Sequence, residues 1–189
     1  MTASTDTEPH WSCECLYDWF AREGLRYERL DHPAVFTAEE AQRLVPPARG
    51  AHAKNLLVED RREGRVFMVT VPFEVRVDLA ALGAALGTKK LRFVSAERMW
   101  DLLGVTPGSV SMLALVNDRT REVSLVLDRS LWSADAVQCH PLVNTATLVF
   151  DQPVLARFLE AFGHAPVVMD VPLRTDMPPR LADGGGSVD

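Results

Sequence analysis

The sequence predicts an α+β protein: a single domain with a central mixed, curled β-sheet and flanking helices. Its 189 residues fit one domain with tails. Hydrophobic residues make up 47% of the chain and charged residues 24%, which supports a sizeable core and excludes global disorder. Segments with strand-type and helix-type spacing of apolar residues are mixed along the chain, without the regular βαβ alternation of a doubly wound parallel sheet.

Helices are predicted where apolar residues recur at helical spacing between a capping residue and a glycine. Thr37, Ser95 and Asp151 are the expected N-caps, and Gly104 and Gly163 the expected ends. The expected helices are residues 12–22, 37–44, 79–86, 95–103 and 151–162, with a short helix or turn at 128–132.

Strands are predicted where apolar residues alternate or form short runs between turn residues. The expected strands are residues 25–30, 51–59, 66–71, 91–94, 111–116, 122–127, 137–140, 145–150 and 167–168. Turns at 61–64 and 117–121 predict two hairpins, one of 51–59 with 66–71 and one of 111–116 with 122–127.

The domain boundaries follow from composition. Residues 1–11 are polar and acidic and are expected to form a flexible N-terminal tail. Residues 12–170 are expected to form the folded domain. Residues 171–189 contain clustered prolines and glycines and are expected to form a disordered C-terminal tail.

Several protein classes are excluded at this stage. No apolar run approaches the roughly 20 residues that a membrane helix needs, and no basic segment followed by an apolar stretch marks a secretory signal. Three cysteines are an odd number, and two of them lie near the chain start, so no disulfide framework is expected. The expected location is the cytoplasm.

The charge distribution limits how the protein can bind nucleic acid. The net charge is −6, whereas a protein that holds nucleic acid by charge alone is usually basic. Basic residues cluster at Lys89, Lys90, Arg92 and Arg98. This cluster is either a solvated face or the patch that meets a phosphate backbone.

The segment around which the chain is organised is the loop at residues 104–109. Pro107 presets φ for a turn, and Gly108 can take the positive φ that most residues avoid. Such a loop can point several backbone N–H groups at one place, as an oxyanion or a phosphate requires. The alternative is a connecting turn with no further role.

Lys54 is the first candidate for chemistry. It lies in the apolar run 51–58, and on an alternating strand it shares a face with Leu56, while Asn55 and Leu57 share the other. Burying an ammonium without a partner is costly. Lys54 is therefore expected to grip a phosphate or a carbonyl oxygen, or else to extend from a sheet edge into solvent.

His140 is the second candidate, with a structural histidine as the alternative. It cannot pair with Cys139, because adjacent strand residues point to opposite faces. Ser109 does not lie in a nucleophile elbow, and the chain contains no P-loop and no zinc-binding spacing. We therefore expect neither a metal nor a cofactor.

Six segments then occur in the order of a known family. They are HPAVFT at 32–37, HAKNL at 52–56, RVDL at 76–79, GVTPGSV at 104–110, LVND at 115–118 and HPLVNTAT at 140–147. Together they resemble the YbaK/prolyl-tRNA synthetase-associated editing domains, with the greatest similarity to free-standing prolyl-tRNA editing proteins. The resemblance covers residues 16–164.

The resemblance implies an α+β fold and hydrolysis of the ester that joins a wrong amino acid to the 3′ adenosine of tRNA. The substrate it implies is alanine on tRNA(Pro), with the acceptor end of tRNA(Pro) as partner and prolyl-tRNA synthetase or an elongation factor as a transient partner. The catalytic positions it implies, together with the candidates above, are Lys54, Gly108, Ser109 and His140. Substrate-binding positions are His32, Phe36, Thr37 and Asn55, and the basic residues expected at the tRNA are Lys89, Lys90 and Arg92.

One departure from the family affects specificity. After Val110 the family commonly continues Thr-Pro-Phe, whereas this chain has Ser111, Met112 and Leu113. We expect Met112 and Leu113 to form a changed wall of the substrate pocket. Two alternatives follow: hydrolysis of another small aminoacyl ester, such as cysteine or serine, and a non-catalytic module that senses an aminoacyl or nucleotide ligand.

Overall fold

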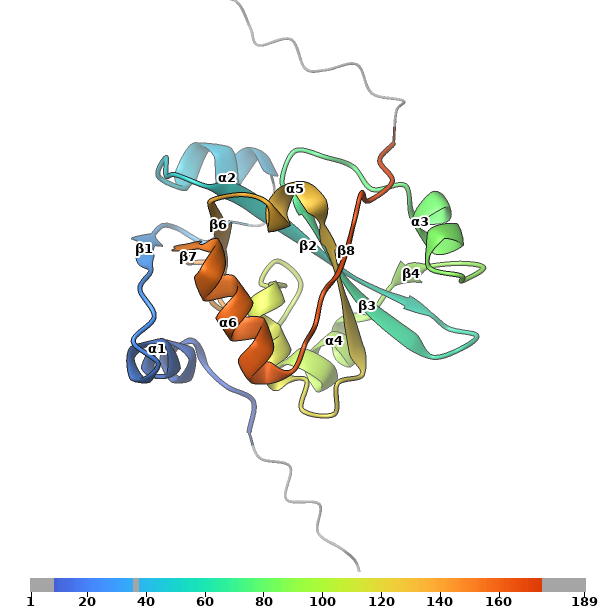
Figure 1. The fold of residues 1–189 in the computed structure, drawn as a ribbon, viewed down its shortest axis with the longest axis horizontal. Helices are drawn as coiled ribbons and strands as arrows, with labels where there is room; N and C mark the ends of the chain where they lie inside the picture. The colour runs from blue at the N-terminus through green and yellow to red at the C-terminus, as the bar shows by residue number, and fades with distance from the viewer. Residues whose placement is uncertain (1–8, 36–37, 175–189) are drawn as a thin grey trace, which may run out of the picture.

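The computed structural model describes residues 9–35 and 38–174 of the chain. Within them, the strands form one mixed sheet in the order β1-β7-β6-β2-β3-β5-β8, with β4 paired to β2 (Figure 1). The strands are β1 (Glu28–Asp31), β2 (Ala51–Asp60), β3 (Arg65–Pro72), β4 (Arg92–Phe93), β5 (Val123–Asp128), β6 (Ala136–Cys139), β7 (Ala146–Asp151) and β8 (Val167–Met169). The helices are α1 (Cys13–Arg22), α2 (Ala38–Leu44), α3 (Leu79–Ala85), α4 (Ala96–Leu103), η1 (Met112–Asn117), α5 (Arg129–Trp132) and α6 (Gln152–Phe162).

The sheet combines both strand directions, which confirms the predicted fold class. Strands β2 and β3 form the predicted hairpin, and β6 lies parallel to the start of β2. Strands β3, β5 and β8 run parallel to one another, whereas β1, β7 and β6 are antiparallel. Strand β2 thus occupies the middle of the sheet.

Local sequence signals set several helix boundaries, and those at Ser95, Gly104 and Gly163 were predicted. The side chains of Ser12 and Ser95 accept hydrogen bonds from backbone amides in the first turns of α1 and α4. Gly104 and Gly163 end α4 and α6 in the left-handed conformation. Asp151 occupies the N-cap position of α6 without a side-chain hydrogen bond. The predicted N-cap Thr37 lies outside the described residues.

The second predicted hairpin is wrong. The apolar run after Ser111 forms the 3₁₀ helix η1, and the Ser111 side chain accepts a hydrogen bond from the Leu113 amide at its start. Strand β5 pairs in parallel with β3 and β8 instead. A short apolar run fits a buried helical turn as well as a buried strand, so periodicity alone does not separate them.

Two hydrophobic clusters enclose the sheet. The larger contains Trp19, Phe20 and Phe158 from α1 and α6, together with η1 and the inward side chains of β2 such as Leu57. The smaller lies on the other side of β2 and includes Val58 and residues of α3. Consecutive side chains of β2 therefore enter different environments, and this alternation positions the candidate site.

Both ends of the described chain contact the domain. The Trp11 amide donates a hydrogen bond to the Asn117 side chain at 2.7 Å. Near the other end, Leu173 forms an antiparallel bridge with Val77. Residues 171–174, which the sequence analysis assigned to the tail, thus contact the domain, while 175–189 lie outside the described residues.

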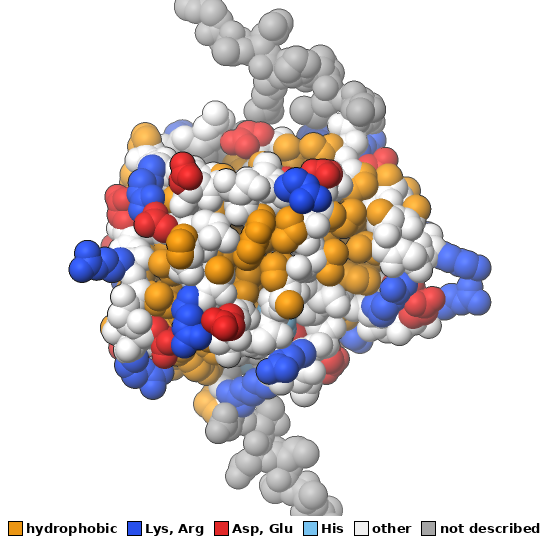
Figure 2. Space-filling model, viewed as in Figure 1, with side chains coloured by type: hydrophobic (Ala, Val, Ile, Leu, Met, Phe, Trp, Pro, Cys, Tyr) orange, Lys and Arg blue, Asp and Glu red, His pale blue; other side chains and the backbone are white. Residues whose placement is uncertain are grey.

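Figure 2 shows that hydrophobic side chains gather across the middle of one face, with charged side chains around them. Val167 of β8 is 51% exposed. A shallow hollow is lined by Trp132, Ala156, Leu159, Glu160, Gly163, Ala165 and Pro166. In the part of the chain that the structure describes, no helix is long and apolar enough to cross a membrane.

Candidate functional site

The side chain of Lys54 lies on the face of β2 that carries the smaller cluster, as the alternation predicted. Its ammonium donates a hydrogen bond to the carbonyl oxygen of Val75, in the connection between β3 and α3. Partial burial lowers the pKa of Lys54; the carboxylate of Glu74 opposes this shift, and the guanidinium of Arg76 adds to it. Lys54 is thus a half-buried cation held by a neutral acceptor.

A hollow of about 730 Å³ opens beside Lys54. Its apolar walls come from β2, β4, α3 and the segment that leads into α3, and its cationic groups come from β2, that same segment and the end of the described chain. The lining residues are Lys54, Leu56, Arg76, Val77, Asp78, Leu79, Ala80, Phe93 and Arg174.

Asn55 points to the opposite side of β2. Its side-chain oxygen accepts one hydrogen bond from the Thr70 hydroxyl at 2.8 Å and a second from the Met112 amide at 3.1 Å. Because Met112 begins η1 shortly after the glycine loop, Asn55 ties the segment that follows the loop to the strand position next to Lys54.

The glycine loop makes the turn that the sequence predicted. Gly108 has a φ of 94°, which only glycine adopts readily. The Ser109 amide donates to the Thr106 carbonyl at 2.9 Å, so this N–H closes the turn, and the Ser109 side chain is buried. Ser109 is therefore a turn residue here. Among the described residues, no backbone acceptor is paired with the Gly108 amide. Gly108 is exposed, so this N–H can reach a ligand.

The structure brings His32 and His140 together, with ring centroids 5.9 Å apart. His140 Nδ1 donates to the Ala146 carbonyl at 2.9 Å. His32 Nδ1 lies 2.9 Å from the carbonyl of Pro33, so its Nε2 accepts from the Thr147 hydroxyl at 3.0 Å. Burial lowers the pKa of His140; the hydrogen bond to the Ala146 carbonyl opposes this shift, and repulsion from His32 adds to it. His140 is thus held as a neutral imidazole.

A third histidine joins this group and was missed from the sequence. His52 stacks on the ring of Phe73, with centroids 4.1 Å apart and planes 3° from parallel. Desolvation lowers the pKa of His52 to about 4, with a further contribution from His140. His52 lies two residues before Lys54, so the same strand alternation would have found it. Among the described residues, no group of three His, Cys, Asp or Glu side chains is arranged to hold a metal ion.

The predicted pocket wall at Met112 and Leu113 is wrong. Both side chains are completely buried in the larger cluster, because η1 turns them into the core. They cannot line an open pocket. Phe36 and Thr37, the other predicted residues of the pocket entrance, lie outside the described residues.

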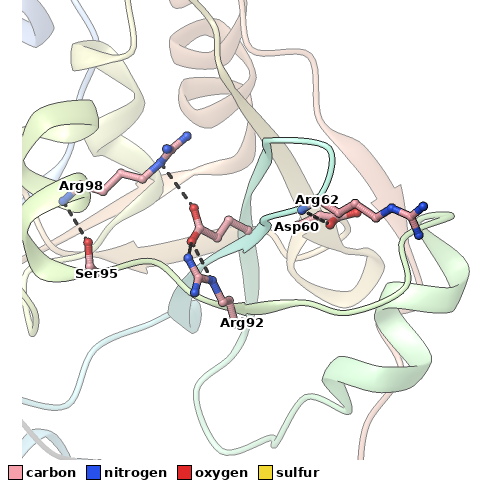
Figure 3. Close-up of polar contacts among 6 residues, drawn as sticks. Asp60, Arg62, Arg92, Ser95 and Arg98 are labelled. Carbon is pink, nitrogen blue, oxygen red and sulfur yellow. Dashed lines mark hydrogen bonds and ion pairs between the residues drawn. The ribbon is translucent and has the colours of Figure 1, made fainter.

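The basic cluster of Lys89, Lys90, Arg92 and Arg98 contains two arginines that form ion pairs and two exposed lysines. Arg92 of β4 and Arg98 of α4 converge on the buried carboxylate of Glu59, whose single negative charge offsets one of the two positive charges (Figure 3). Lys89 and Lys90 are exposed in the turn before β4. The structure thus gives Arg92 a part in joining β4 to β2, although its side chain remains 40% exposed.

The predicted catalytic residues fall into separate groups. Lys54 lies at the hollow, His140 lies with His32 and His52, and Gly108 lies in the loop tied to Asn55. Among the described residues, no hydrogen bond joins the glycine loop to Lys54 or His140.

Comparison with known proteins identifies the family. The family model for the aminoacyl-tRNA editing domain matches residues 32–158. Prolyl-tRNA synthetase associated domain-containing protein 1 of Danio rerio is 35% identical over 156 residues, which cover 82% of this chain and 84% of that protein. Prolyl-tRNA editing protein ProX of Acetoanaerobium sticklandii is 31% identical over 140 residues, covering 74% and 85%.

The fold agrees with these similarities. The crystal structure of a proposed trans-editing enzyme for prolyl tRNA synthetase superposes with a TM-score of 0.62, at 22% identity, over 85% of this chain and 96% of that one. The matched segment contains Lys54, the glycine loop and His140. The chain belongs to the aminoacyl-tRNA editing domain family.

Proposed function

We propose that this protein is a trans-editing deacylase that hydrolyses the ester of mischarged tRNA(Pro), with alanine as the amino acid removed. The observation that carries the proposal is the half-buried ammonium of Lys54 at the edge of an open hollow, within the segment that matches the editing family. The protein names of the relatives, which refer to prolyl-tRNA, supply the choice of tRNA.

Lys54 holds the substrate in this proposal. Its only acceptor in the described residues is the neutral carbonyl of Val75, so an incoming anion or carbonyl oxygen meets an ammonium that no carboxylate neutralises by direct contact. Because partial desolvation strengthens electrostatic interactions, a phosphate of the terminal nucleotide is bound more strongly there than at an exposed lysine.

The glycine loop stabilises the developing oxyanion. The Ser109 amide is used within the turn, so the Gly108 amide is the donor that we assign to the oxyanion. Removal of one such donor in other enzymes lowers the rate on the order of a hundred- to a thousandfold. Asn55 supports this donor indirectly, because it fixes the backbone at Met112.

Water is the nucleophile, and the neighbouring hydroxyl of the terminal ribose orients it. No serine or cysteine in the described site is both exposed and paired with a base: Ser109 is buried in its turn, and burial raises the pKa of the Cys139 thiol far above its usual range. A substrate that ends in 2′-deoxyadenosine should therefore be hydrolysed much more slowly, and normal hydrolysis would refute this step.

The proposed selectivity is that of a second sieve. A synthetase pocket built for proline rejects a smaller amino acid weakly, since each missing methylene is worth only about 1–3 kcal/mol. An editing pocket that admits alanine and excludes proline removes the resulting error. The replacement of the family's Thr-Pro-Phe by Ser111, Met112 and Leu113 does not support cysteine or serine as the substrate, because the Met112 and Leu113 side chains are buried in the core.

The test is the release of labelled alanine from Ala-tRNA(Pro), compared between the wild-type protein and Lys54→Ala under single-turnover conditions. The proposal predicts rapid release by the wild type and none above background by the variant. Equal release by both would indicate a contaminating hydrolase or a mechanism that does not use Lys54, and no release by either would overturn the deacylase activity.

A further inference from the structure

Asn117, the last residue of η1, joins the two ends of the chain segment that contains the glycine loop. Its side-chain nitrogen donates a hydrogen bond to the carbonyl oxygen of Leu103, the last residue of α4, at 2.8 Å. The last carbonyls of a helix have no partner within the helix, so this contact satisfies one of them. It also holds the start of the glycine loop, because the loop begins at the next residue, Gly104.

The hydrogen bonds of Asn117 and Asn55 bracket the loop. Asn117 holds the backbone just before it, and Asn55 holds the Met112 amide shortly after it. Among the described residues, the one backbone–backbone hydrogen bond donated by residues 105–111 is that from Ser109 to Thr106. The position of the loop backbone, including the Gly108 amide, therefore depends on the contacts at its two ends.

The N-terminal segment, residues 9–11, provides the second partner of Asn117. The Trp11 amide donates to the side-chain oxygen of Asn117 at 2.7 Å, and the Trp11 ring packs edge-on against Phe162 with centroids 5.5 Å apart. His10 covers the start of the loop, since a Cβ added at Gly104 would lie 2.5 Å from the His10 side chain. The N-terminal segment thus packs directly on the part of the chain that carries the loop.

A carboxamide is required between these two partners. The Asn117 side chain is buried, and it meets an N–H donor on one side and a carbonyl acceptor on the other. An aspartate would accept from the Trp11 amide but would place an acceptor against the Leu103 carbonyl, and a leucine of similar shape would satisfy neither partner. This requirement gives a physical reason for asparagine in the LVND segment at 115–118.

We propose that Asn117 is a positioning residue for deacylation: it holds the glycine loop so that the Gly108 amide faces the developing oxyanion, and the N-terminal segment fixes the Asn117 side chain in place. This inference rests on the proposed function, because it takes the Gly108 amide to be the oxyanion donor. The N-terminal segment lies outside residues 32–158, which the family model matches, so its contact with Asn117 is not part of the matched editing domain.

The test combines two measurements on the full chain. The first is steady-state deacylation of Ala-tRNA(Pro), and the second is hydrogen exchange of a peptide covering residues 104–111, measured by mass spectrometry without substrate. Asn117→Asp and Asn117→Leu should both speed the exchange of this peptide. They should lower kcat about tenfold to a hundredfold, as expected for a misplacement of about 1 Å, and leave KM unchanged because Lys54 still holds the substrate.

Asp128→Ala is the matched control for the loss of a buried side chain with two partners. Asp128 accepts hydrogen bonds from the amides of Ser130 at 2.9 Å and Val171 at 3.1 Å. It lies at the far end of β5 from Val123, about 17 Å along the strand. This variant should lose stability while kcat and the exchange of residues 104–111 stay at the wild-type values. Equal changes in the control and the Asn117 variants, or unchanged values in the Asn117 variants, would overturn the inference.

A pair of variants at Trp11 tests the same contact without a substitution at Asn117. Trp11→Ala keeps the amide donor and loses the ring, whereas Trp11→Pro loses both. Exchange of residues 104–111 should be faster, and kcat lower, in Trp11→Pro than in Trp11→Ala. Equal values in the two variants would refute the part assigned to the N-terminal segment.

The outcome is separable from the proposed function. A wild type that deacylates no aminoacyl-tRNA would refute the deacylase and the catalytic part of this inference, while the exchange measurement would still decide whether Asn117 orders the loop. A wild type that deacylates Ala-tRNA(Pro), with the same kcat in the Asn117 variants, would support the deacylase and refute the positioning role.

Discussion

The side-chain oxygen of Asn55 accepts a hydrogen bond from the backbone amide of Met112 at 3.1 Å, and this contact joins the central strand to the segment that follows the glycine loop. The same oxygen accepts from the Thr70 hydroxyl at 2.8 Å. One side chain next to Lys54 thereby fixes the position of a backbone 57 residues away in sequence.

Replacement of Asn55 by alanine should lower both stability and activity. The change leaves the Met112 amide without its acceptor, and an unsatisfied buried donor costs about 1–3 kcal/mol. Thr70→Val is the matched control, because it removes the other hydrogen bond and leaves the Met112 contact in place. Urea unfolding and deacylation rates should show a loss of activity in Asn55→Ala that Thr70→Val does not share; equal activity losses would contradict the role of the Met112 contact.

Loss of the Lys54 ammonium should abolish deacylation without unfolding the protein. Lys54→Ala and Lys54→Met should each lower the rate on the order of a hundredfold or more. Because the ammonium is partly desolvated, its removal should change the free energy of unfolding by no more than about 1 kcal/mol. A thermal unfolding curve checks the fold, and retention of the full rate by Lys54→Met would remove the ammonium from the mechanism.

A methyl group at Gly108 should impair catalysis more than the strain alone explains. An L-residue in the left-handed region costs about 1–2 kcal/mol, and a shift of the loop would also misplace the Gly108 amide. Gly24→Ala is the control, because Gly24 has a φ of 66° and an added Cβ there meets no atom within 4 Å. The two variants should lose similar stability, and only Gly108→Ala should lose at least tenfold in rate; similar rates would remove the loop from the mechanism.

Stability should fall as the pH is lowered from 7 to 5. The pKa of His52 in the folded protein is about 4, below the value of about 6.5 expected in the unfolded chain. The unfolded state therefore takes up more protons in this range, and stability decreases as pH falls. His140, whose pKa is also lowered by burial, acts in the same direction. Urea unfolding of the wild type should show a loss of about 2 kcal/mol.

The variant His52→Gln separates this effect from other titrations. It removes the titrating ring and should reduce the difference in unfolding free energy between pH 7 and pH 5. A wild-type protein that is equally stable or more stable at pH 5 would contradict the burial of neutral His52 against Phe73.

His140 should contribute to activity less than Lys54 does. The ring of His140 is fixed by the Ala146 carbonyl and lies beside His32, so its loss removes a neutral, oriented group rather than a charge. We expect His140→Ala to lower the deacylation rate by about tenfold, less than the usual effect of a positioned general acid or base. An unchanged rate would assign His140 a structural role.

Local signals made most elements predictable. The Ser95 cap and the terminal glycines Gly104 and Gly163 marked the boundaries of α4 and the end of α6, and alternation around Lys54 gave the correct faces of β2. The helix η1 was mistaken for a strand, because a six-residue apolar run looks the same in both states. The parallel pairing of β3 with β5 was also missed, since it depends on contacts between distant segments.

The candidate site was predictable only in part. The face of β2 on which Lys54 lies was predictable from strand alternation. The burial of Met112 and the stacking of His52 on Phe73 depend on tertiary contacts. Sequence spacing does not encode which side chain meets which neighbour across the sheet.

The most direct measurement is a deacylation panel with Ala-, Ser-, Cys- and Pro-tRNA(Pro), together with Ala-tRNA(Ala), at enzyme concentrations well below those of the substrates. The account predicts multiple turnovers on Ala-tRNA(Pro) with Pro-tRNA(Pro) spared. Preferred loss of serine or cysteine would contradict the assignment of alanine, and the absence of turnover on every member of the panel would contradict the deacylase itself.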